Sequence, residues 1–505
     1  MFMGRHLSFY VKSNKTLGRL ASKPGICEPS CSRMRRGVRI LYTIDSLLGR
    51  VQHGNAFMSK HVYIKTYGCQ MNEHDTQRMV SMMAALGYEA TGAPDNADVI
   101  LVNTCSVRAN PENKVYSFLG ALRPLKKQNP ELIVGVAGCV AQQAGMQLLA
   151  REPLVDMVFG PDNLFALPDM LQAVRRGERL CRTEWHPWGG PVSEFVPAQW
   201  IDQDHVDGVR AYIAITKGCD NHCSFCIVPR TRGREVSRSR EGILREAQFL
   251  IKRGAKEIWL LGQNVNSYRA GDNYGFLELL DDLSRLDGLA RLRFTSPHPR
   301  DWNNALSDLM AARSTICNHL HLPFQAGSDK ILNAMRRRHS IAEYLDKVHY
   351  LKRVVPGVEV SADLIVGFPG ESDADFEQTL RVLEEVRFSQ VFPFKYSPRP
   401  DTAAAKLPDD VPRPVKDARL AQVIALQERI NVEQQRALVG SVQEVLLDSP
   451  HPRESGIING RTEGYRAITV AGEGLRVGDL TRTTVTGFRG HWLESEAIQT
   501  ADALV

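Results

Sequence analysis

The sequence predicts an α/β protein with three folded parts: an N-terminal doubly wound parallel-sheet domain, a central partial (β/α)6 barrel, and a small antiparallel C-terminal β-barrel of OB-like type. Short β-branched runs alternate with amphipathic stretches from residue 60 to about 176 and again from 209 to 437, which is typical of parallel sheets. Residues 438–502 instead carry short strand-like runs between Gly and Asp turns. A chain of 505 residues has room for three domains of ordinary size.

The first 57 residues differ in composition from the rest of the chain. They carry ten Lys/Arg and two Asp/Glu, a balance of +8, whereas the whole chain carries +6, so the remainder stands at −2. We expect either that Met58 is the true start or that residues 1–57 are a disordered tail, with a mitochondrial transit peptide as the alternative. No apolar run reaches membrane-spanning length, so we expect a soluble, cytoplasmic protein.

Three expected strands in the N-terminal part run directly into a cysteine. The thiols are Cys69, Cys105 and Cys139, and the strands before them are His61–Tyr67, Val99–Val102 and Leu132–Val136, with helices expected at Asp75–Leu86 and Lys114–Leu125. Because ligands bind beyond the carboxyl ends of strands in open α/β sheets, we expect the three thiols to converge. Ordinary buried thiols are the alternative. Gly68 and Gly138 are expected to let the backbone approach a bulky cofactor.

After a linker at about 177–208, strand and helix alternate in six β/α units. The expected strands are Ala211–Thr216, Glu257–Leu261, Arg291–Thr295, His319–Pro323, Val358–Val366 and Val386–Tyr396. The expected helices are Arg238–Arg253, Phe276–Leu286, Asp329–Met335 and Asp375–Val386. Barrel enzymes place their chemistry at the carboxyl ends of such strands.

A C-x3-C-x2-C triplet follows the first barrel strand and consists of Cys219, Cys223 and Cys226. Three thiolates at this spacing can hold three irons of a [4Fe–4S] cube and leave the fourth iron open to a substrate or cofactor. The alternative is a structural zinc site completed by His222, which lies inside the turn. Thiolates at metal-ligand positions require a reducing compartment.

Residues 438–502 follow a long helix expected at about 414–437. The expected strands are Val439–Leu447, Gly456–Arg461, Ala467–Val470 and Arg482–Phe488. Small barrels of this kind bind nucleic acid through aromatic and cationic side chains. From residue 436 onward, however, seven Lys/Arg face nine acidic residues, so composition favours a protein-binding barrel about as much.

The cysteine motifs resemble the methylthiotransferase family of radical S-adenosylmethionine (SAM) enzymes. The shared stretches are the triplet, Tyr67-Gly-Cys-Gln-Met-Asn72, Asn103-Thr-Cys-Ser-Val-Arg108 and Gly138-Cys-Val-Ala-Gln142, and the resemblance extends from about residue 60 to 502. It implies two [4Fe–4S] clusters: one at the triplet that cleaves SAM, and an auxiliary one at Cys69, Cys105 and Cys139 that presents sulfur. The stretch Gly460-Arg-Thr462 resembles the TRAM module of RNA-modifying enzymes.

The resemblance also implies further site residues. Expected SAM contacts at polar strand ends are Gln263, Asn264, Gln325, Ser328 and Glu371, and expected RNA contacts are Arg461, Tyr465, Arg466 and Trp492. No catalytic side chain is expected beyond the cluster ligands. Two positions depart from the family pattern, with Ala326 where Ser is frequent and Asp401 where Gly is usual.

Within the family, Leu260-Leu-Gly-Gln-Asn-Val-Asn-Ser-Tyr268 resembles the branch that acts on a prenylated adenosine at position 37 of tRNA, converting C2–H to C2–SCH3. The implied partners are tRNA, a flavodoxin- or ferredoxin-type electron donor and a sulfur source, and nothing demands more than a monomer. The alternatives are the branches acting on a threonylcarbamoyl adenosine or on an aspartate of a small-subunit ribosomal protein. A non-enzymatic iron–sulfur protein that binds RNA is the rival from another class.

Overall fold

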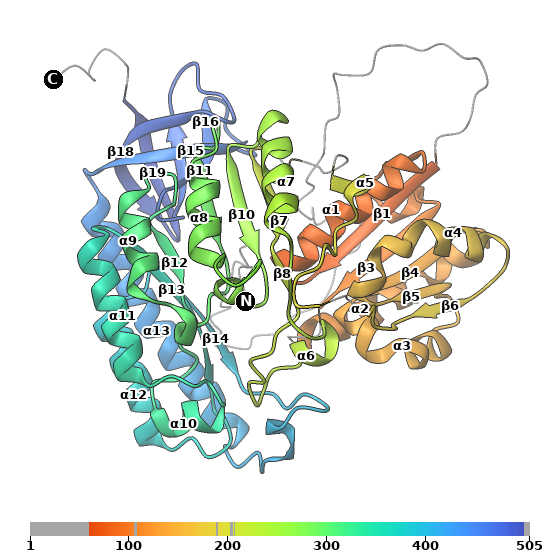
Figure 1. Ribbon diagram of the computed structural model, residues 1–505, viewed down its shortest axis with the longest axis horizontal. Coiled ribbons are helices and arrows are strands. Elements are labelled where there is room, and N and C mark those ends of the chain that lie inside the picture. Colours follow the sequence, from red (N-terminus) through yellow and green to blue (C-terminus); the bar gives the residue numbers. More distant parts are fainter. Residues whose placement is uncertain (1–59, 106–108, 188–189, 202–205, 207, 499–505) are drawn as a thin grey trace, which may run out of the picture.

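Figure 1 shows the computed structural model, in which residues 60–105, 109–187, 190–201, 206 and 208–498 are described. The expected tail at residues 1–57 lies outside this part of the chain. The predicted fold class is confirmed, because an N-terminal parallel sheet, a partial barrel and a closed C-terminal barrel follow one another along the chain. None of the described helices combines the length and the apolar character needed to cross a membrane.

The N-terminal sheet has six strands, all parallel, in the order β2-β1-β3-β4-β5-β6. Their bounds are β1 (Lys60–Tyr67), β2 (Tyr88–Ala90), β3 (Val99–Thr104), β4 (Ile133–Gly138), β5 (Met157–Phe159) and β6 (Leu180–Arg182). The three strands predicted before cysteines are therefore confirmed. The other three have only three residues each, too few to show a periodic pattern.

Helices cover both faces of this sheet, as a doubly wound fold requires (Figure 1). Helices α1 (Gln70–Ala85) and α4 (Leu167–Arg175) bury one apolar face, which includes Met79, Met82 and Leu167. Helices α2 (Ala109–Gln128) and α3 (Cys139–Arg151) cover the opposite face with side chains such as Leu119 and Leu148. Because both faces are covered, β3 and β4 are buried at every position.

The barrel has six main strands in two three-stranded parallel sheets. Their bounds are β7 (Arg210–Ala214), β10 (Glu257–Leu261), β11 (Arg291–Phe294), β12 (His319–His321), β13 (Glu359–Val366) and β14 (Gln390–Lys395). The sequence predicted six consecutive β/α units, but the hydrogen-bonded sheet is interrupted between β11 and β12. Leu292 of β11 instead pairs with residues 315 and 317, just ahead of β12.

Four of the seven helices described in the barrel lie where they were predicted, namely α7 (Arg240–Lys252), α8 (Phe276–Ser284), α10 (Asp329–Ala334) and α12 (Asp373–Val386). The other three, α6 (Val228–Thr231), α9 (Asn304–Ala312) and α11 (Ile341–Val354), were not predicted. Helices α9 and α11 are capped by Asn303 and Ser340, which directly precede them and whose side chains accept hydrogen bonds from backbone N–H groups of the first turn. For α11 this is a capping box with Glu343, a sequence signal of a helix start.

Helix α13 (Arg413–Leu438) leads into a closed C-terminal barrel. Its strands are β15 (Val442–Pro450), β16 (Ile457–Thr462), β17 (Ala467–Ala471), β18 (Leu480–Arg489) and β19 (Trp492–Ala497). The expected antiparallel pairing holds for four ladders, but β17 and β19 pair in parallel to close the barrel.

Buried charges join the C-terminal barrel to the strand starts of the central barrel. Glu257, at the start of β10, accepts from Arg293 at 2.7 Å, and Arg293 also donates to the backbone oxygens of Thr462 (3.0 Å) and Glu463 (2.8 Å). Arg291 donates to the Arg461 backbone oxygen at 2.7 Å. The C-terminal barrel therefore lies at the end of the strands opposite to the cysteine triplet.

Candidate functional site

The cysteine triplet follows β7 and the short strand β8 (Thr216–Lys217). Gly218 makes the turn at φ +73°, and a Cβ there would meet the Arg234 backbone oxygen at 1.9 Å. The Cys219 N–H donates to the Gly233 oxygen at 3.2 Å. Farther along, the Ser224 hydroxyl donates to the Ala334 oxygen at 2.7 Å. The triplet loop is thus held at both ends by backbone contacts.

The three triplet thiols lie close enough to affect one another's ionisation. Burial and the neighbouring Cys223 raise the pKa of Cys219 to about 12. Burial and Cys223 likewise raise the pKa of Cys226 to about 12. Arg337 donates to the Cys223 sulfur at 3.5 Å. Three thiolates at one place need cationic compensation beyond this arginine, and bound iron supplies it. The donor set therefore fits an iron–sulfur cluster.

The zinc alternative fails on geometry. His222 is exposed and held at φ +47°. Within the described ranges, no three His, Cys, Asp or Glu side chains come together closely enough for a single metal ion. Zinc needs four ligands around one point, whereas the corners of a cube keep cysteine ligands apart. The arrangement therefore disfavours zinc and leaves a cube possible.

The second set of thiols meets at the carboxyl ends of three adjacent strands. Cys69 follows β1 and is the N-cap of α1, Cys105 follows β3, and Cys139 follows β4 as the first residue of α3. A hydrogen bond with the Cys105 side chain lowers the pKa of Cys69 to about 6, against the opposing effect of burial. Burial raises the pKa of Cys139, and the charge of Cys69 adds to this rise. The predicted convergence is therefore present in the structure.

The glycines before Cys69 and Cys139 are required by the packing of the strand ends. A Cβ on Gly138, at φ +90°, would lie 2.4 Å from the Thr104 backbone oxygen. A Cβ on Gly68 would lie 2.5 Å from Oδ1 of Asn72. Protein atoms therefore occupy the space that a side chain would need at these two positions, and the approach of a cofactor to this backbone stays a prediction. These glycines allow close strand-end packing and so place the thiols.

Comparison with known proteins identifies the family. Residues 61–160 match the Uncharacterized protein family UPF0004, and residues 213–383 match the Radical SAM superfamily. Proteins named tRNA-2-methylthio-N(6)-dimethylallyladenosine synthase from Pelotomaculum thermopropionicum and Acidithiobacillus ferrooxidans are 42% and 45% identical to this chain. Both alignments cover 85% of this chain, and they cover 96% and 95% of those proteins. The chain belongs to this synthase family.

Solved structures show the same architecture for the barrel of this synthase family member. The radical S-adenosylmethionine methyltransferase TsrM from Kitasatospora setae aligns with a TM-score of 0.51 at 14% identity, covering 69% of this chain and 77% of that one. At this identity the likeness shows the fold alone. The superfamily match implies one [4Fe–4S] cluster and SAM.

One expected SAM contact of the synthase has the properties of an open binding group. Gln263 follows β10 and is 7% exposed, yet neither atom of its amide has a hydrogen-bond partner among the described residues. An unpaired buried amide is costly unless a ligand completes it. Gln325 is also buried, with its backbone at φ +70°. Both remain predicted SAM contacts.

The other three expected SAM contacts are engaged within the protein. Asn264 donates to Asp301 at 2.9 Å, and the Ser328 hydroxyl donates to Asp375 at 2.7 Å. Glu371 accepts from Arg419 at 2.7 Å and from a backbone N–H at 2.6 Å. These side chains shape the strand-end loops, and their contact with SAM stays a prediction.

The expected RNA contacts lie mainly at the interface of the two barrels. Tyr465 packs edge-on against Trp259, with ring centroids 4.9 Å apart. Arg466 donates to Glu359 at 2.6 Å, and Arg461 lies over the rings of Tyr465 and Trp492 at 5.0 and 5.7 Å. The sequence alone could not show that Tyr465 and Arg466 pack against the central barrel. RNA binding by these residues stays a prediction.

Two functional candidates were missed by the sequence analysis. Arg337, beside Cys223, lies in the Arg336–Arg338 run that follows α10, and only that run of cations signals it. Arg232 lies six residues after Cys226, and its charge acts on Cys69 and Cys139 of the second thiol set.

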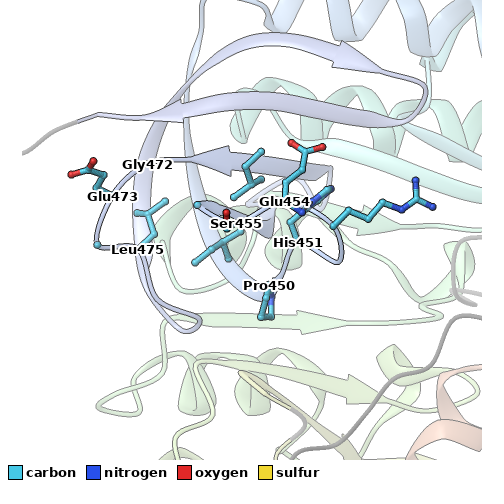
Figure 2. Close-up of a pocket in the computed structure, with 12 residues that line it drawn as sticks. Pro450, His451, Glu454, Ser455, Gly472, Glu473 and Leu475 are labelled. Carbon is cyan, nitrogen blue, oxygen red and sulfur yellow. Dashed lines mark hydrogen bonds between the residues drawn. The ribbon is translucent and has the colours of Figure 1, made fainter.

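A cavity of about 540 Å³ lies on the C-terminal barrel (Figure 2). Its lining comes from the turn after β15 and the turn after β17, and includes His451, Glu454 and Gly472 (Figure 2). No cysteine lines it. This cavity therefore contains none of the predicted cluster ligands.

Proposed function

We propose that this protein methylthiolates C2 of N6-dimethylallyladenosine at position 37 of tRNA. The observation that carries the proposal is the convergence of Cys69, Cys105 and Cys139 beside a barrel that holds a separate cysteine triplet. Each set is one ligand short of a closed cluster, so each leaves an iron free to react. The 42–45% identical relatives named for this activity support the choice of substrate.

The chemistry explains why the chain would need two clusters. An aromatic C–H between ring nitrogens offers no useful handle to acid–base groups. When bound, a cluster at the triplet supplies reductive cleavage of SAM, and an auxiliary cluster supplies sulfur. The side chains bind and orient these groups and exclude water. Arg337 offsets thiolate charge at Cys223, and the Gln263 amide offers a donor and an acceptor at the carboxyl end of β10.

The proposed partners follow from this chemistry. Reduction of the triplet cluster needs a low-potential donor of flavodoxin or ferredoxin type, and each turnover consumes sulfur from a separate source. Thiolate-bound iron and a tRNA substrate both fit the cytoplasm.

Nucleoside mass spectrometry of tRNA from a deletion strain tests the proposal. We expect the methylthio group to disappear from prenylated adenosine while the prenyl group remains. Loss from a threonylcarbamoyl adenosine instead, or unchanged tRNA with an unmodified ribosomal aspartate, would assign the protein to one of the other two methylthiotransferase branches. Anaerobic reconstitution with dithionite and SAM separates the enzyme from a non-enzymatic carrier, because only the enzyme produces 5′-deoxyadenosine.

A further inference from the structure

One buried arginine connects the two thiol sets. Arg232 closes helix α6, six residues after Cys226, and its side chain is 6% exposed. Its Nη2 donates to Oδ2 of Asp75 at 2.8 Å, across 157 positions of sequence. Asp75 lies on α1, six residues after Cys69. The segment that follows the triplet therefore places the positive charge of Arg232 against the N-terminal domain.

The same guanidinium lies at the second thiol set. Arg232 ends α6, which packs against α3, the helix that begins at Cys139. Its charge lowers the pKa of Cys139 and of Cys69, against the effect of burial. Burial opposes its charge, but Asp75, Cys139 and Cys69 together hold its pKa well above the usual range. A permanently charged group is thus enclosed between one carboxylate and the thiols.

The other charges around this pair are balanced or neutral. Lys217 forms an ion pair with Asp162, so the two charges largely cancel. His74 Nδ1 lies 3.7 Å from Asp75, and burial lowers the pKa of His74, which keeps the ring neutral. Within the described part of the chain, Arg232 is therefore the main cation acting on Cys69 and Cys139, with Asp75 opposing it at Cys139.

We propose that Arg232 raises the reduction potential of the cluster held by Cys69, Cys105 and Cys139, and that Asp75 lowers it. The inference rests on the proposed function only in placing a cluster at these thiols. Three thiolates make a ligated cube an anion, and an added electron makes it more negative. A buried cation stabilises the reduced form, and a buried carboxylate destabilises it, with little screening by salt.

Arg232 and the second thiol set belong to different domains of the protein. Arg232 belongs to the loop of the triplet, so it reaches the second cluster only while the barrel and the N-terminal sheet are docked. The docked protein therefore holds its auxiliary cluster at a different potential from the separated N-terminal domain.

Anaerobic redox titration followed by electron paramagnetic resonance tests the proposal. The parent protein is the full chain with Cys219, Cys223 and Cys226 changed to Ala, so that only the auxiliary cluster gives a signal. We expect Arg232→Gln to lower the midpoint potential, Asp75→Asn to raise it, and Arg232→Lys to keep it near the parent value. Arg230→Gln is the matched control, because Arg230 is an exposed arginine of the same helix.

Opposite shifts are the decisive result, because Arg232→Gln and Asp75→Asn break the same ion pair. Mere loosening of the structure would move both midpoint potentials in the same direction. That result, or no shift while the cluster is retained, overturns this inference and leaves the proposed function untouched. If Arg232→Gln cannot hold iron, the other two variants test the inference. Asp75→Asn should then raise the midpoint potential, and Arg232→Lys should leave it unchanged. A parent protein that binds no cluster overturns both this inference and the auxiliary cluster of the proposed function.

Discussion

Arg78 of α1 and Glu246 of α7 form an ion pair that is buried between the N-terminal sheet and the barrel, with side chains 1% and 0% exposed. Arg238 donates to the other oxygen of the same carboxylate. Burial alone would raise the pKa of Glu246, but the two guanidiniums outweigh it and lower the pKa to about 2. Together with the Arg232–Asp75 pair, this carboxylate links α1, which begins just after Cys69, to the barrel that carries the triplet.

Replacing Glu246 by Gln should destabilise the protein strongly. The change leaves two buried guanidiniums facing a neutral amide, and breaking a buried charge pair costs about 3–5 kcal/mol. Urea unfolding measures the effect. Asp281→Asn is the control, because Asp281 also pairs with two guanidiniums, those of Arg285 and Arg313, but at a partly exposed site, where each such pair contributes about 1 kcal/mol or less. Equal effects of the two changes would show that the Glu246 cluster does not join the domains.

The same carboxylate should make stability depend on acid. Because the folded pKa of Glu246 is about 2 and its ordinary value is 4.5, its stabilisation is fully present above pH 4.5 and is lost as the pH falls towards 2. Unfolding of the wild type and of Glu246→Gln at decreasing pH measures this. The difference between them should shrink below pH 4.5. A constant difference across this window would contradict the assignment.

The sequence predicted that Cys69, Cys105 and Cys139 converge because each of them follows a strand, and strand ends converge by a general rule. The triplet of Cys219, Cys223 and Cys226 was predicted from its spacing alone. No such rule predicts the positions of Arg232 and Arg337 near the thiols. Their partners, Asp75 and Cys223, lie 157 and 114 positions away, so only the packing of distant elements brings them together. Charge partners of a site are thus harder to predict than its ligands.

The C-terminal barrel shows a second limit of sequence reasoning. Arg461, Tyr465 and Arg466 have the residue types of an RNA-binding face, but they pack against the central barrel. Composition identifies cations and aromatics without saying which face of a barrel is docked. The departure at Asp401 was easier to interpret, because its φ of +65° is the conformation that the usual Gly favours.

Substitutions of single cysteines should separate the two sites. Cys223→Ala removes a ligand of the cluster that cleaves SAM and should abolish 5′-deoxyadenosine formation. Cys105→Ala should spare some cleavage but stop sulfur transfer. Both products, 5′-deoxyadenosine and the methylthiolated nucleoside, are measured in one reaction. Cys181→Ala is the control, since this thiol lies on edge strand β6 and should keep both activities. Methylthiolated product from Cys105→Ala would refute the auxiliary site.

Gly138→Ala should displace Cys139 and reduce the iron bound at the second site. The new Cβ would meet backbone at 2.4 Å, in addition to the cost of a left-handed conformation, so we expect a loss above about 2 kcal/mol. Gly177→Ala is a closely matched control, with φ +88° and no atom within 4 Å of the new Cβ. It should cost only about 1 kcal/mol and keep its iron. Thermal unfolding and iron analysis of both proteins measure the contrast, and similar losses would contradict it.

Gln263→Leu should weaken SAM binding without destabilising the protein. The buried amide of Gln263 has no partner among the described residues, so an apolar side chain of similar shape removes an unsatisfied group and should leave the melting temperature unchanged or higher. In the complex the same change removes hydrogen bonds to SAM, and we expect Kd to rise about tenfold, equivalent to roughly 1.4 kcal/mol. Calorimetry with the reconstituted enzyme measures Kd, and iron analysis checks that the cluster is intact. Unchanged affinity would remove Gln263 from the SAM site. A lower melting temperature with unchanged affinity would show that the amide has a structural partner instead.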